Sequence, residues 1–340
     1  MKAFNCKAKL GFFGLTGLLI MSVLISCVQK EKESNETLNH DYYVAAYIWP
    51  SCHHDERFGD ILWPEGIGEW EVIKKGTPRF EGHYQPKVPL WGYEMDDNPR
   101  VMEKWIDAAT DHGVNVFIFD WYWFDGGPFL ESTLNNGFLK AKNNEKMKFY
   151  VMWANHDVRR NYWNVYKYKD DNSLLWEGEV DLKNFKIIVD RVINQYFKVP
   201  NYFKIDGKPV FHVFAPNNLV KGLEGLEKTK EALEYFREAT RKAGFPGLHL
   251  QFRAGGGMEP SLLSEKFSEG KSINEIIEYL GVNSVAKYGW GHKQDYIRLG
   301  VETLKKRHKL DSKHSATKYE NYSVYTKVHV PGDSIHDPQR

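Results

Sequence analysis

Cysteine is scarce in this chain, and neither sign of charge is in large excess. The 340 residues include three cysteines, and the formal net charge is +1 at pH 7. Two of the cysteines, Cys6 and Cys27, fall in an N-terminal targeting segment, which leaves Cys52 alone. We therefore expect neither an intramolecular disulfide nor a cysteine-rich metal site. The near-neutral balance gives no basic field, so nucleic acid is not an expected partner.

Repeats and linkers are also absent from the sequence. Residues 42–340 contain no internal repeat, no low-complexity stretch and no linker rich in proline or serine, which predicts a single domain. Aromatic residues, in contrast, are abundant, with 11 Trp, 19 Tyr and 20 Phe. Such a composition suits a sugar-binding cleft, although core packing alone could also account for it.

The N-terminus has the pattern of a targeting segment. Three lysines precede the apolar stretch 10–25, and Leu24-Ile25-Ser26-Cys27 resembles the lipobox of bacterial lipoproteins. The resemblance implies a signal peptide over residues 1–26, acylation of the Cys27 thiol, and a membrane anchor at the bacterial outer membrane or cell surface. Residues 27–41 are polar and charged and predict a flexible tether. The alternative is a single transmembrane anchor, for which the apolar stretch is short.

Short apolar segments alternate with amphipathic ones after residue 41. This alternation predicts βα units and a parallel sheet, closed as a (β/α)8 barrel rather than opened as a doubly wound sheet. No glycine-rich phosphate turn follows the first strand, as an open nucleotide-binding sheet would usually show. The predicted strands are Tyr42–Trp49, Val114–Asp120, Lys148–Trp153, Pro209–Phe214, Leu248–Phe252, Val282–Tyr288 and Ser323–Val330. Seven strands are found rather than eight.

The helices expected between these strands have recognisable ends. Asn98 is a predicted N-cap, with Pro99 in the first turn and Gly113 after the last. Two further helices are predicted around Phe185–Tyr196 and over Leu226–Ala243. The first connection, Pro50–Asn98, is far longer than the usual βα loop and is therefore expected to be functional.

One strand carries the strongest chemical signal. Val114–Trp123 is an apolar run that ends in an acid, Asp120, set among three large aromatics. A run of this kind suits a strand covered on both faces. The carboxyl ends of such strands carry the chemistry of α/β barrels, and indole or phenol rings offer surfaces for a sugar ring. The alternative interpretation is a strand end sealed by core aromatics.

Several motifs occur in a fixed order along the long first loop and this strand. Together they resemble the WbsX-type, glycoside hydrolase family 99-like domains of bacterial polysaccharide loci, from about residue 42 to the end. The motifs are Trp63-Pro64-Glu65-Gly66, Gly68-Glu69-Trp70, Gly82-His83-Tyr84-Gln85-Pro86, Pro89-Leu90-Trp91-Gly92-Tyr93 and Phe119-Asp120-Trp121-Tyr122-Trp123.

The resemblance implies a (β/α)8 barrel that acts on polysaccharide. For family 99 itself it implies retaining hydrolysis of α-mannosidic bonds without a redox cofactor. Two glutamates in a Glu-Trp-x-Glu-Gly motif after the last barrel strand would assist an attack by the substrate's own 2-hydroxyl group and act as acid and base.

The sequence departs from this pattern near its end. Residues 334–340 resemble the family's turn after the seventh strand, and no Glu-Trp-x-Glu-Gly motif follows. The eighth βα unit and its acid pair are therefore expected to be missing. Trp176-Glu177-Gly178-Glu179 is superficially similar, but it lies between the third and fourth strands and is interpreted as a solvated approach to a helix.

The remaining residues predict a binding cleft. Asp120 is the candidate catalytic residue, with a structural hydrogen bond as the alternative. Asn155 and His156 follow the third strand, and His83 with Gln85 could either reach sugar hydroxyls or staple the loop. The predicted substrate-binding residues are Glu69, Trp70, His83, Gln85, Trp121, Tyr122, Trp123, Asn155, His156, Tyr288 and Trp290.

Two tryptophans and one polar run receive non-catalytic assignments. Trp105 and Trp153 are interpreted as core residues. The run His53-His54-Asp55-Glu56 is interpreted as a solvated turn rather than a metal site, since adjacent ligands in a loop are a weak signal. No metal and no cofactor are expected, and the oligomeric state is left open.

Three functions remain compatible with the sequence. The first is a lipid-anchored glycoside hydrolase-like protein acting on polysaccharide. The second is a lipoprotein that binds carbohydrate without cleaving it, because the family acid pair is not found. The third is sugar transfer in polysaccharide assembly, which the export signal disfavours.

Overall fold

The computed structural model of the chain describes residues 43–253, 264–286 and 324–325. All of them belong to one compact unit, Tyr43–Arg340. The predicted signal peptide, tether and lipidated Cys27, together with Tyr288 and Trp290, lie outside the described residues. Among the described residues, no helix has the length and apolar character needed to span a bilayer.

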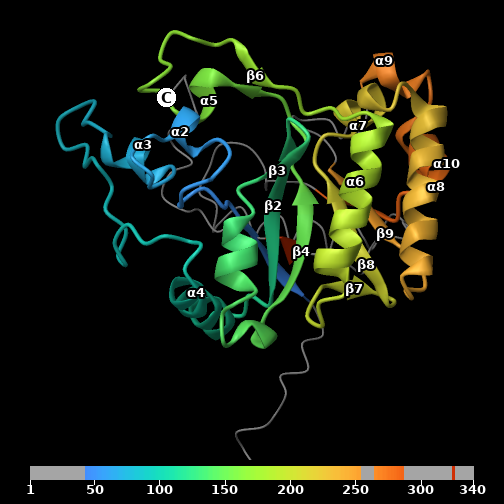
Figure 1. Cartoon of the computed structure of the whole chain (residues 1–340), viewed down its shortest axis with the longest axis horizontal. Coiled ribbons are helices and arrows are strands. Elements are labelled where there is room, and N and C mark those ends of the chain that lie inside the picture. The colour runs from blue at the N-terminus through green and yellow to red at the C-terminus, as the bar shows by residue number, and fades with distance from the viewer. Residues whose placement is uncertain (1–42, 254–263, 287–323, 326–340) are drawn as a thin grey trace, which may run out of the picture. The chain divides into compact units, whose positions relative to one another are not determined.

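The main sheet is parallel and wound in one direction. Its strand order is β10-β9-β8-β4-β2-β1-β11. From β1 to β10, each strand of this order therefore lies beside the sheet strand that precedes it in the sequence. The last strand, β11, pairs with the other side of β1. A doubly wound sheet would instead reverse its order near the first strand. The α/β class with a curled, mostly parallel sheet is therefore confirmed (Figure 1).

The strands of this sheet lie close to their predicted positions. The fourth and fifth predicted strands, β8 and β9 in the structure, differ from prediction by one residue at each end. The second, β2, continues four residues beyond Asp120. The strands are β1 Val44–Ile48, β2 Val116–Phe124, β4 Lys148–Trp153, β8 Lys208–Val213, β9 His249–Arg253, β10 Ser284–Ala286 and β11 Val324–Tyr325. Sequence patterns did not predict the short antiparallel additions, which are β3 Gly127–Phe129, β5 Val158–Arg159, β6 Leu174–Trp176 and β7 Lys204–Ile205.

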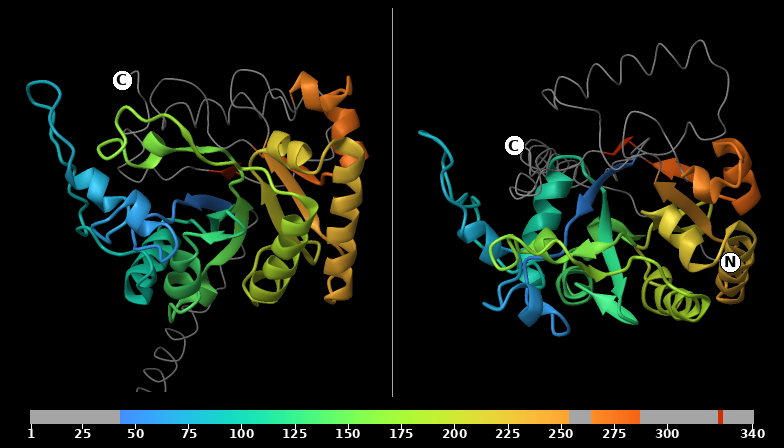
Figure 2. Two further views of the ribbon diagram at one scale, coloured as in Figure 1. Left: turned by 45° about the horizontal axis from the view of Figure 1, so that its top comes forward. Right: turned by 90° about the horizontal axis from the view of Figure 1, so that it is seen from above.

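The long helices cover one face of the sheet (Figure 2). Helix α4 begins after Asn98, whose side chain accepts from the backbone N–H of Arg100, with Pro99 in the first turn as predicted. The principal helices are α4 Pro99–Asp111, α6 Leu182–Val192 with its continuation η3 Ile193–Phe197, α7 Pro216–Gly222, α8 Leu226–Lys242 and α10 Ile273–Leu280. The shorter ones are α2 Gly59–Leu62, α3 Trp70–Lys74, η1 Thr133–Phe138, η2 Asn144–Lys146, α5 Arg160–Trp163 and α9 Glu265–Ser268.

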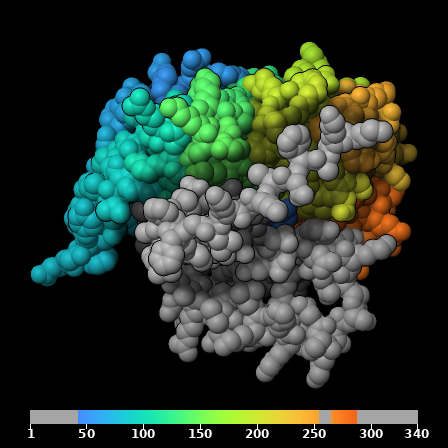
Figure 3. All heavy atoms as spheres, turned by 90° about the horizontal axis from the view of Figure 1, so that it is seen from below, coloured from blue at the N-terminus to red at the C-terminus, as the bar shows by residue number. Residues whose placement is uncertain are grey.

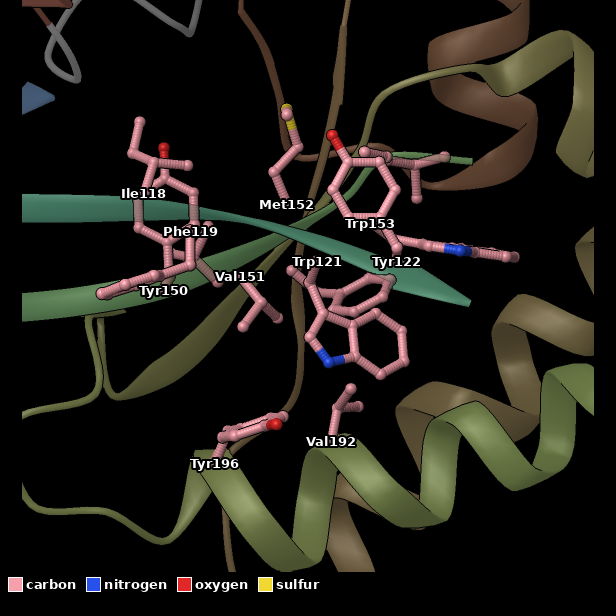
Figure 4. Close-up of a cluster of buried hydrophobic side chains, with 14 of the residues drawn as sticks. Ile118, Phe119, Trp121, Tyr122, Tyr150, Val151, Met152, Trp153, Val192 and Tyr196 are labelled. Carbon is pink, nitrogen blue, oxygen red and sulfur yellow. The ribbon is translucent and has the colours of Figure 1, made fainter. Parts of the chain in front are cut away.

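Alternation along each strand separates an outer face from an inner face. Outer residues pack on the helices: the ring centroids of Phe211 and Phe236 are 5.1 Å apart, and those of Trp153 and Phe185 are 6.3 Å apart. Figure 4 shows Trp121 and Val151 directed toward Val192 and Tyr196, with Met152 on the opposite side. The residues between these outer positions therefore face inward.

The first loop is compact where it meets the sheet. The backbone N–H groups of Arg57, Phe58 and Leu130 all donate to the Asp55 carboxylate. His53 Nδ1 lies 2.7 Å from Asp96 Oδ1, and both side chains are buried. The predicted solvated turn at His53-His54-Asp55-Glu56 is therefore wrong for His53 and Asp55, because each closes a long-range backbone or side-chain contact.

In Figure 3 the coloured atoms follow the chain order from blue through green and yellow to orange.

Candidate functional site

A row of polar side chains crosses the inner face of the sheet. Strand register aligns Asp120 with Met152, Met152 with His212, His212 with Gln251, and Gln251 with Ser284. All five positions are buried. Four of these five side chains can hydrogen-bond, although they come from strands that are otherwise strongly apolar. We call Asp120, Met152, His212, Gln251 and Ser284 the inner row.

Most of the polar groups around the inner row have partners. Gln251 Nε2 donates to Ser284 Oγ at 3.0 Å, and the Tyr150 hydroxyl donates to Gln251 Oε1 at 3.3 Å. One position below the inner row, His249 Nε2 lies 2.8 Å from Ser284 Oγ. These contacts fix the rotamers on the β9 and β10 side of the face.

An aromatic rim lies at the carboxyl end of the sheet, next to the inner row. Its members stand at the carboxyl ends of five successive strands, and we define the rim as Trp49, Tyr122, His156, Phe214 and Arg253. Tyr122 meets Trp49 edge-on at 5.8 Å between ring centroids and meets His156 edge-on at 5.9 Å. His156 and Phe214 are 5.7 Å apart, and the Arg253 guanidinium carbon lies 4.0 Å from the Phe214 centroid.

The rim and the inner row are in register. Tyr122 follows Asp120 by two residues, Phe214 follows His212 by two, and Arg253 follows Gln251 by two. Because strand side chains alternate, each pair lies on the same face. Trp49, His156, Phe214 and Arg253 are partly exposed, whereas the inner row is buried. The carboxyl end of the sheet therefore presents rings and a cation over a layer of hydrogen-bonding groups.

Glu69 positions the rim from the first loop. Its carboxylate accepts from the Trp49 indole N–H and from the Ser51 hydroxyl, the latter at 2.6 Å. Glu69 itself is buried. A carboxylate held in this way fixes the Trp49 ring. The structure therefore places Glu69 beside the predicted site as a support for its aromatic wall.

His156 is held in one orientation at the rim. Its Nδ1 lies 2.9 Å from the Asp157 carbonyl oxygen, which can only accept, so Nδ1 carries the proton in the neutral ring. Burial lowers the pKa of His156 below its ordinary value. The neutral ring then leaves Nε2 as an acceptor. This geometry suits a hydrogen bond from a ligand hydroxyl group.

Trp121 and Trp123, two of the predicted binding residues, lie on the outer face. Trp121 Nε1 donates to Glu131 Oε1 at 2.6 Å, and Trp123 Nε1 lies 3.3 Å from Asn184 Oδ1. Both side chains are buried toward the helices. The alternation of β2 therefore divides the Asp120–Trp123 motif, with Asp120 and Tyr122 inside and the two tryptophans outside.

Trp70, His83 and Gln85 are elsewhere in the first loop. Trp70 packs with Cys52 and Ile73 in a small separate cluster. His83 lies 3.3 Å from Gln85, between the two side-chain nitrogens, and its ring stacks on Phe80. The structure brings none of them into contact with a rim residue.

Asn155 braces the neighbouring connection. Its side chain donates to the Ala215 carbonyl at 2.9 Å and accepts from the Ala215 N–H at 2.7 Å. The carbonyl of Asn155 also accepts from Asn218 Nδ2. Asn155 therefore ties the end of β4 to the end of β8, beneath His156 and Phe214. Trp153 is fully buried and Trp105 packs against the core, as predicted.

The Trp176–Glu179 segment lines a hollow on the outer side. This hollow has a volume of about 540 Å³ and includes Trp123, Glu177 and Lys221 in its lining. Lys221 Nζ lies 2.9 Å from Glu179 Oε2. The segment leads into α6 as expected, and the close contact of Gly178 with the Asn155 backbone joins it to the rim connection.

The described residues contain no candidate metal centre. Within residues 43–253, 264–286 and 324–325, no group of three histidine, cysteine or acidic residues converges as metal ligands would. His53 is instead engaged by Asp96, and Thr133 Oγ1 lies 3.1 Å from the same His53 nitrogen. Burial alone would lower the pKa of His53, but the Asp96 hydrogen bond and charge raise it overall.

Sequence reasoning missed seven residues of this arrangement, namely Trp49, Met152, His212, Phe214, Gln251, Arg253 and Ser284. A signal was present for His212, Gln251 and Ser284, because each is a polar residue inside an otherwise apolar strand. Such a residue faces either a partner or a site. Only the register of the folded sheet shows that the three lie level with Asp120.

The chain belongs to the family described as glycosyltransferase WbsX, whose family model matches residues 44–330. This confirms the family resemblance drawn from the sequence motifs.

Two curated relatives are uncharacterized proteins WxcX from two strains of Xanthomonas campestris pv. campestris. Each is 24% identical over 226 residues, which cover 62% of this chain. The match spans only 28% of each relative's length.

Solved structures with similarity to the chain include a glycoside hydrolase-like protein, at 20% identity and a TM-score of 0.34, covering 64% of this chain and 52% of the other. The GH99 endo-alpha-mannosidase from Bacteroides thetaiotaomicron is 12% identical, with a TM-score of 0.40 and coverage of 83% and 70%. Its complex with bis-tris propane gives a TM-score of 0.39 at 12% identity, with coverage of 84% and 68%.

Proposed function

We propose that this chain binds a polysaccharide at the rim and acts on it as a glycoside hydrolase-like protein. The observation that carries the proposal is the series of edge-on ring contacts that joins Trp49, Tyr122, His156 and Phe214 at the carboxyl end of the sheet, next to Asp120. Aromatic faces bury the apolar faces of sugar rings. Carboxylate, imidazole and amide groups nearby can hydrogen-bond the hydroxyls, which is the division of labour of ligand sites.

Asp120 is the residue to which we assign the chemical step. Glycoside cleavage uses carboxyl groups to donate and accept protons around an oxocarbenium-like transition state. Asp120 lies on the inner face, next to the rim, where a glycosidic oxygen would approach it. The motif resemblance makes α-mannosidic polymers, cleaved with retention, the first substrates to test.

Two other functions are distinguishable by experiment. Binding without turnover is favoured by the presence of a single carboxylate in the inner row, since glycosidases usually employ a pair. Glycosyl transfer is favoured by the family's description as glycosyltransferase WbsX. The hydrolytic proposal predicts new reducing ends from a glycan alone, whereas transfer requires an activated sugar donor.

The experiment is a glycan panel with the whole chain. Mannans and other bacterial polysaccharides are incubated with wild-type protein and with the Asp120→Asn variant, and both reducing ends and binding are measured. Hydrolysis predicts release by the wild type and a loss of at least two orders of magnitude in the variant. Binding with no release would support the carbohydrate-binding function, and the absence of both would contradict the proposal.

We further propose that the protein is anchored through a lipid on Cys27. The support is the lipobox-like Leu24-Ile25-Ser26-Cys27 that follows a charged and apolar leader. Labelling with a fatty acid analogue in a bacterial host should mark the wild type and not Cys27→Ser. Label on both proteins, or on neither, would contradict the proposal.

We also propose that the sheet continues into a closed (β/α) barrel. The support is the pairing of β11 with β1 on the side opposite β2, which is the order a closed barrel requires of its later strands. An experimental structure of the chain would test this by showing hydrogen-bonded strands between β10 and β11.

A further inference from the structure

His212 is the anomalous side chain of the inner row. It lies in β8 between Met152 and Gln251 in the strand register, and its ring is completely buried. Within the part of the chain that the structure describes, neither Nδ1 nor Nε2 has a hydrogen-bond partner. The nearest aromatic contact is with Tyr47, at 6.5 Å between ring centroids.

The cost of this arrangement needs an explanation. A buried polar group without a partner destabilises the folded state, whereas an apolar side chain of similar volume at the same place would not. The neighbouring polar groups do have partners: Gln251 and His249 both contact Ser284. His212 therefore keeps its hydrogen-bonding capacity at the expense of stability, although polar side chains beside it on the same face do have hydrogen-bond partners.

The chemistry of the ring narrows the class of ligand group. Burial, with a smaller effect of the Arg253 charge, lowers the pKa of His212 to about 3, so the imidazole is neutral near pH 7. A neutral imidazole offers one N–H donor and one acceptor nitrogen. A hydroxyl group also donates and accepts, so it can use either nitrogen. A carboxylate or phosphate oxygen can only accept.

We propose that His212 is the floor of the glycan site and hydrogen-bonds a sugar hydroxyl that enters beneath Phe214. Phe214 stands two residues farther along the same face of β8, in the rim, so the ring above and the imidazole below would clasp one sugar unit. This inference rests on the proposed glycan function and adds a specificity-determining residue to it. The preferred sugar carries a hydroxyl group at the buried position.

The deoxy analogue of that sugar should bind worse. A site built to hydrogen-bond a hydroxyl group rejects a ligand that lacks it, because the polar group of the protein is then left unpaired. For one neutral hydrogen bond the expected loss of affinity is on the order of 10-fold. A set of monodeoxy ligands would show which hydroxyl group the floor contacts.

The decisive experiment compares two histidines on the same face. His212→Leu and His249→Leu are purified, and thermal melting and the affinity for the best glycan of the panel are measured by calorimetry. We expect His212→Leu to melt at a higher temperature than wild type and to bind on the order of 10-fold more weakly. His249→Leu, which removes the contact with Ser284, should instead melt at a lower temperature than the wild type.

The outcomes separate the two levels of the proposal. If the wild type binds glycan and His212→Leu binds equally well, the floor contact is wrong and the proposed function stands. If the wild type binds no glycan, the proposed function fails and the floor contact fails with it. A third variant, His212→Gln, retains a donor and an acceptor and should recover part of the affinity. If His212→Leu does not fold, His212→Ala takes its place, and unchanged glycan binding by that variant overturns the inference.

Discussion

Tyr122 and Trp123 are neighbours in β2, yet they face opposite sides of the sheet. Tyr122 packs edge-on against Trp49 and His156 at the rim. Trp123 is buried on the outer face, and its Nε1 lies 3.3 Å from Asn184 Oδ1 at the start of α6. Of the aromatic residues in the motif around Asp120, Tyr122 therefore shares the inner face with that carboxylate.

This division predicts that two neighbouring substitutions differ in their effect on glycan binding. Tyr122→Leu should weaken glycan binding about 10-fold, because the edge-on contacts that hold the rim rings are lost. Trp123→Phe should leave binding unchanged, since its indole points away from the rim. Calorimetric titration with the same oligosaccharide measures both. Equal losses in the two variants would mean that the rim is not the binding surface.

A partly buried polar cluster on the outer face predicts a large stability effect. Glu131 accepts from Trp121 Nε1 at 2.6 Å, from Arg191 Nε at 2.8 Å and from the Tyr196 hydroxyl at 2.9 Å. Glu131→Ala leaves the Trp121 and Arg191 donors unpaired, while the Tyr196 hydroxyl keeps Asn135 Oδ1 as a partner. The variant should therefore lower the free energy of unfolding by about 3 kcal/mol. Urea denaturation measures the change.

The control for that variant is an exposed ion pair. Lys228 and Glu224 form an i, i+4 pair before and within α8, and both side chains are mostly exposed. Glu224→Ala should leave the denaturation midpoint unchanged, because exposed pairs contribute little. A shift as large as that of Glu131→Ala would contradict the assignment of Glu131 as a structural hub.

Two inner-face histidines predict acid sensitivity. Burial, with the nearby cations Arg253 and Lys208 respectively, lowers the pKa of His212 to about 3 and that of His249 to about 4. An unfolded histidine titrates near 6.5, so below that pH the unfolded state binds more protons than the native state. Stability is therefore retained above pH 6.5 and lost as the pH falls.

The measurement is urea denaturation between pH 6.5 and pH 5. Each of these histidines should contribute up to about 1.4 kcal/mol of lost stability per pH unit. His212→Leu should lose that share of the slope while His249 retains its own. The same slope in the variant and the wild type would show that the pKa of His212 is not lowered in the folded state.

Gly178 predicts a coupling between the Trp176–Glu179 segment and the rim. A Cβ at this position would lie 2.3 Å from the Asn155 carbonyl oxygen and 2.5 Å from the His156 carbonyl carbon, both of which are backbone atoms. Gly178→Ala should therefore displace the connection that carries His156 and weaken glycan binding several-fold. Affinity and thermal melting are the readouts.

The matched control for Gly178→Ala is Gly59→Ala. There the added Cβ would meet the His54 side chain at 2.8 Å, and that exposed side chain can move aside. Binding should be unaffected in this variant. If Gly178→Ala also binds normally, the position of His156 does not depend on the close packing of this segment.

Local patterns were sufficient to predict the elements but not the site. The run Val116–Phe124 is apolar enough to require burial on both faces, and Asn98-Pro99 has the chemistry of a helix start, so both could be placed from residues close in sequence. Trp121 and Trp123 were assigned to the binding site together with Tyr122. Their proximity in sequence hid the fact that a strand sends adjacent side chains in opposite directions.

The amino-acid sequence by itself determined the family, the parallel α/β class and the position of Asp120 in its strand, because motif order and hydrophobic periodicity are properties of the chain alone. Only the tertiary structure decided which residues accompany Asp120. His212, Gln251 and Ser284 reach its level through the register of strands far apart in sequence, and Glu69 reaches Trp49 through the folded first loop. Register and loop closure are set by packing over the whole sheet, which no local pattern records.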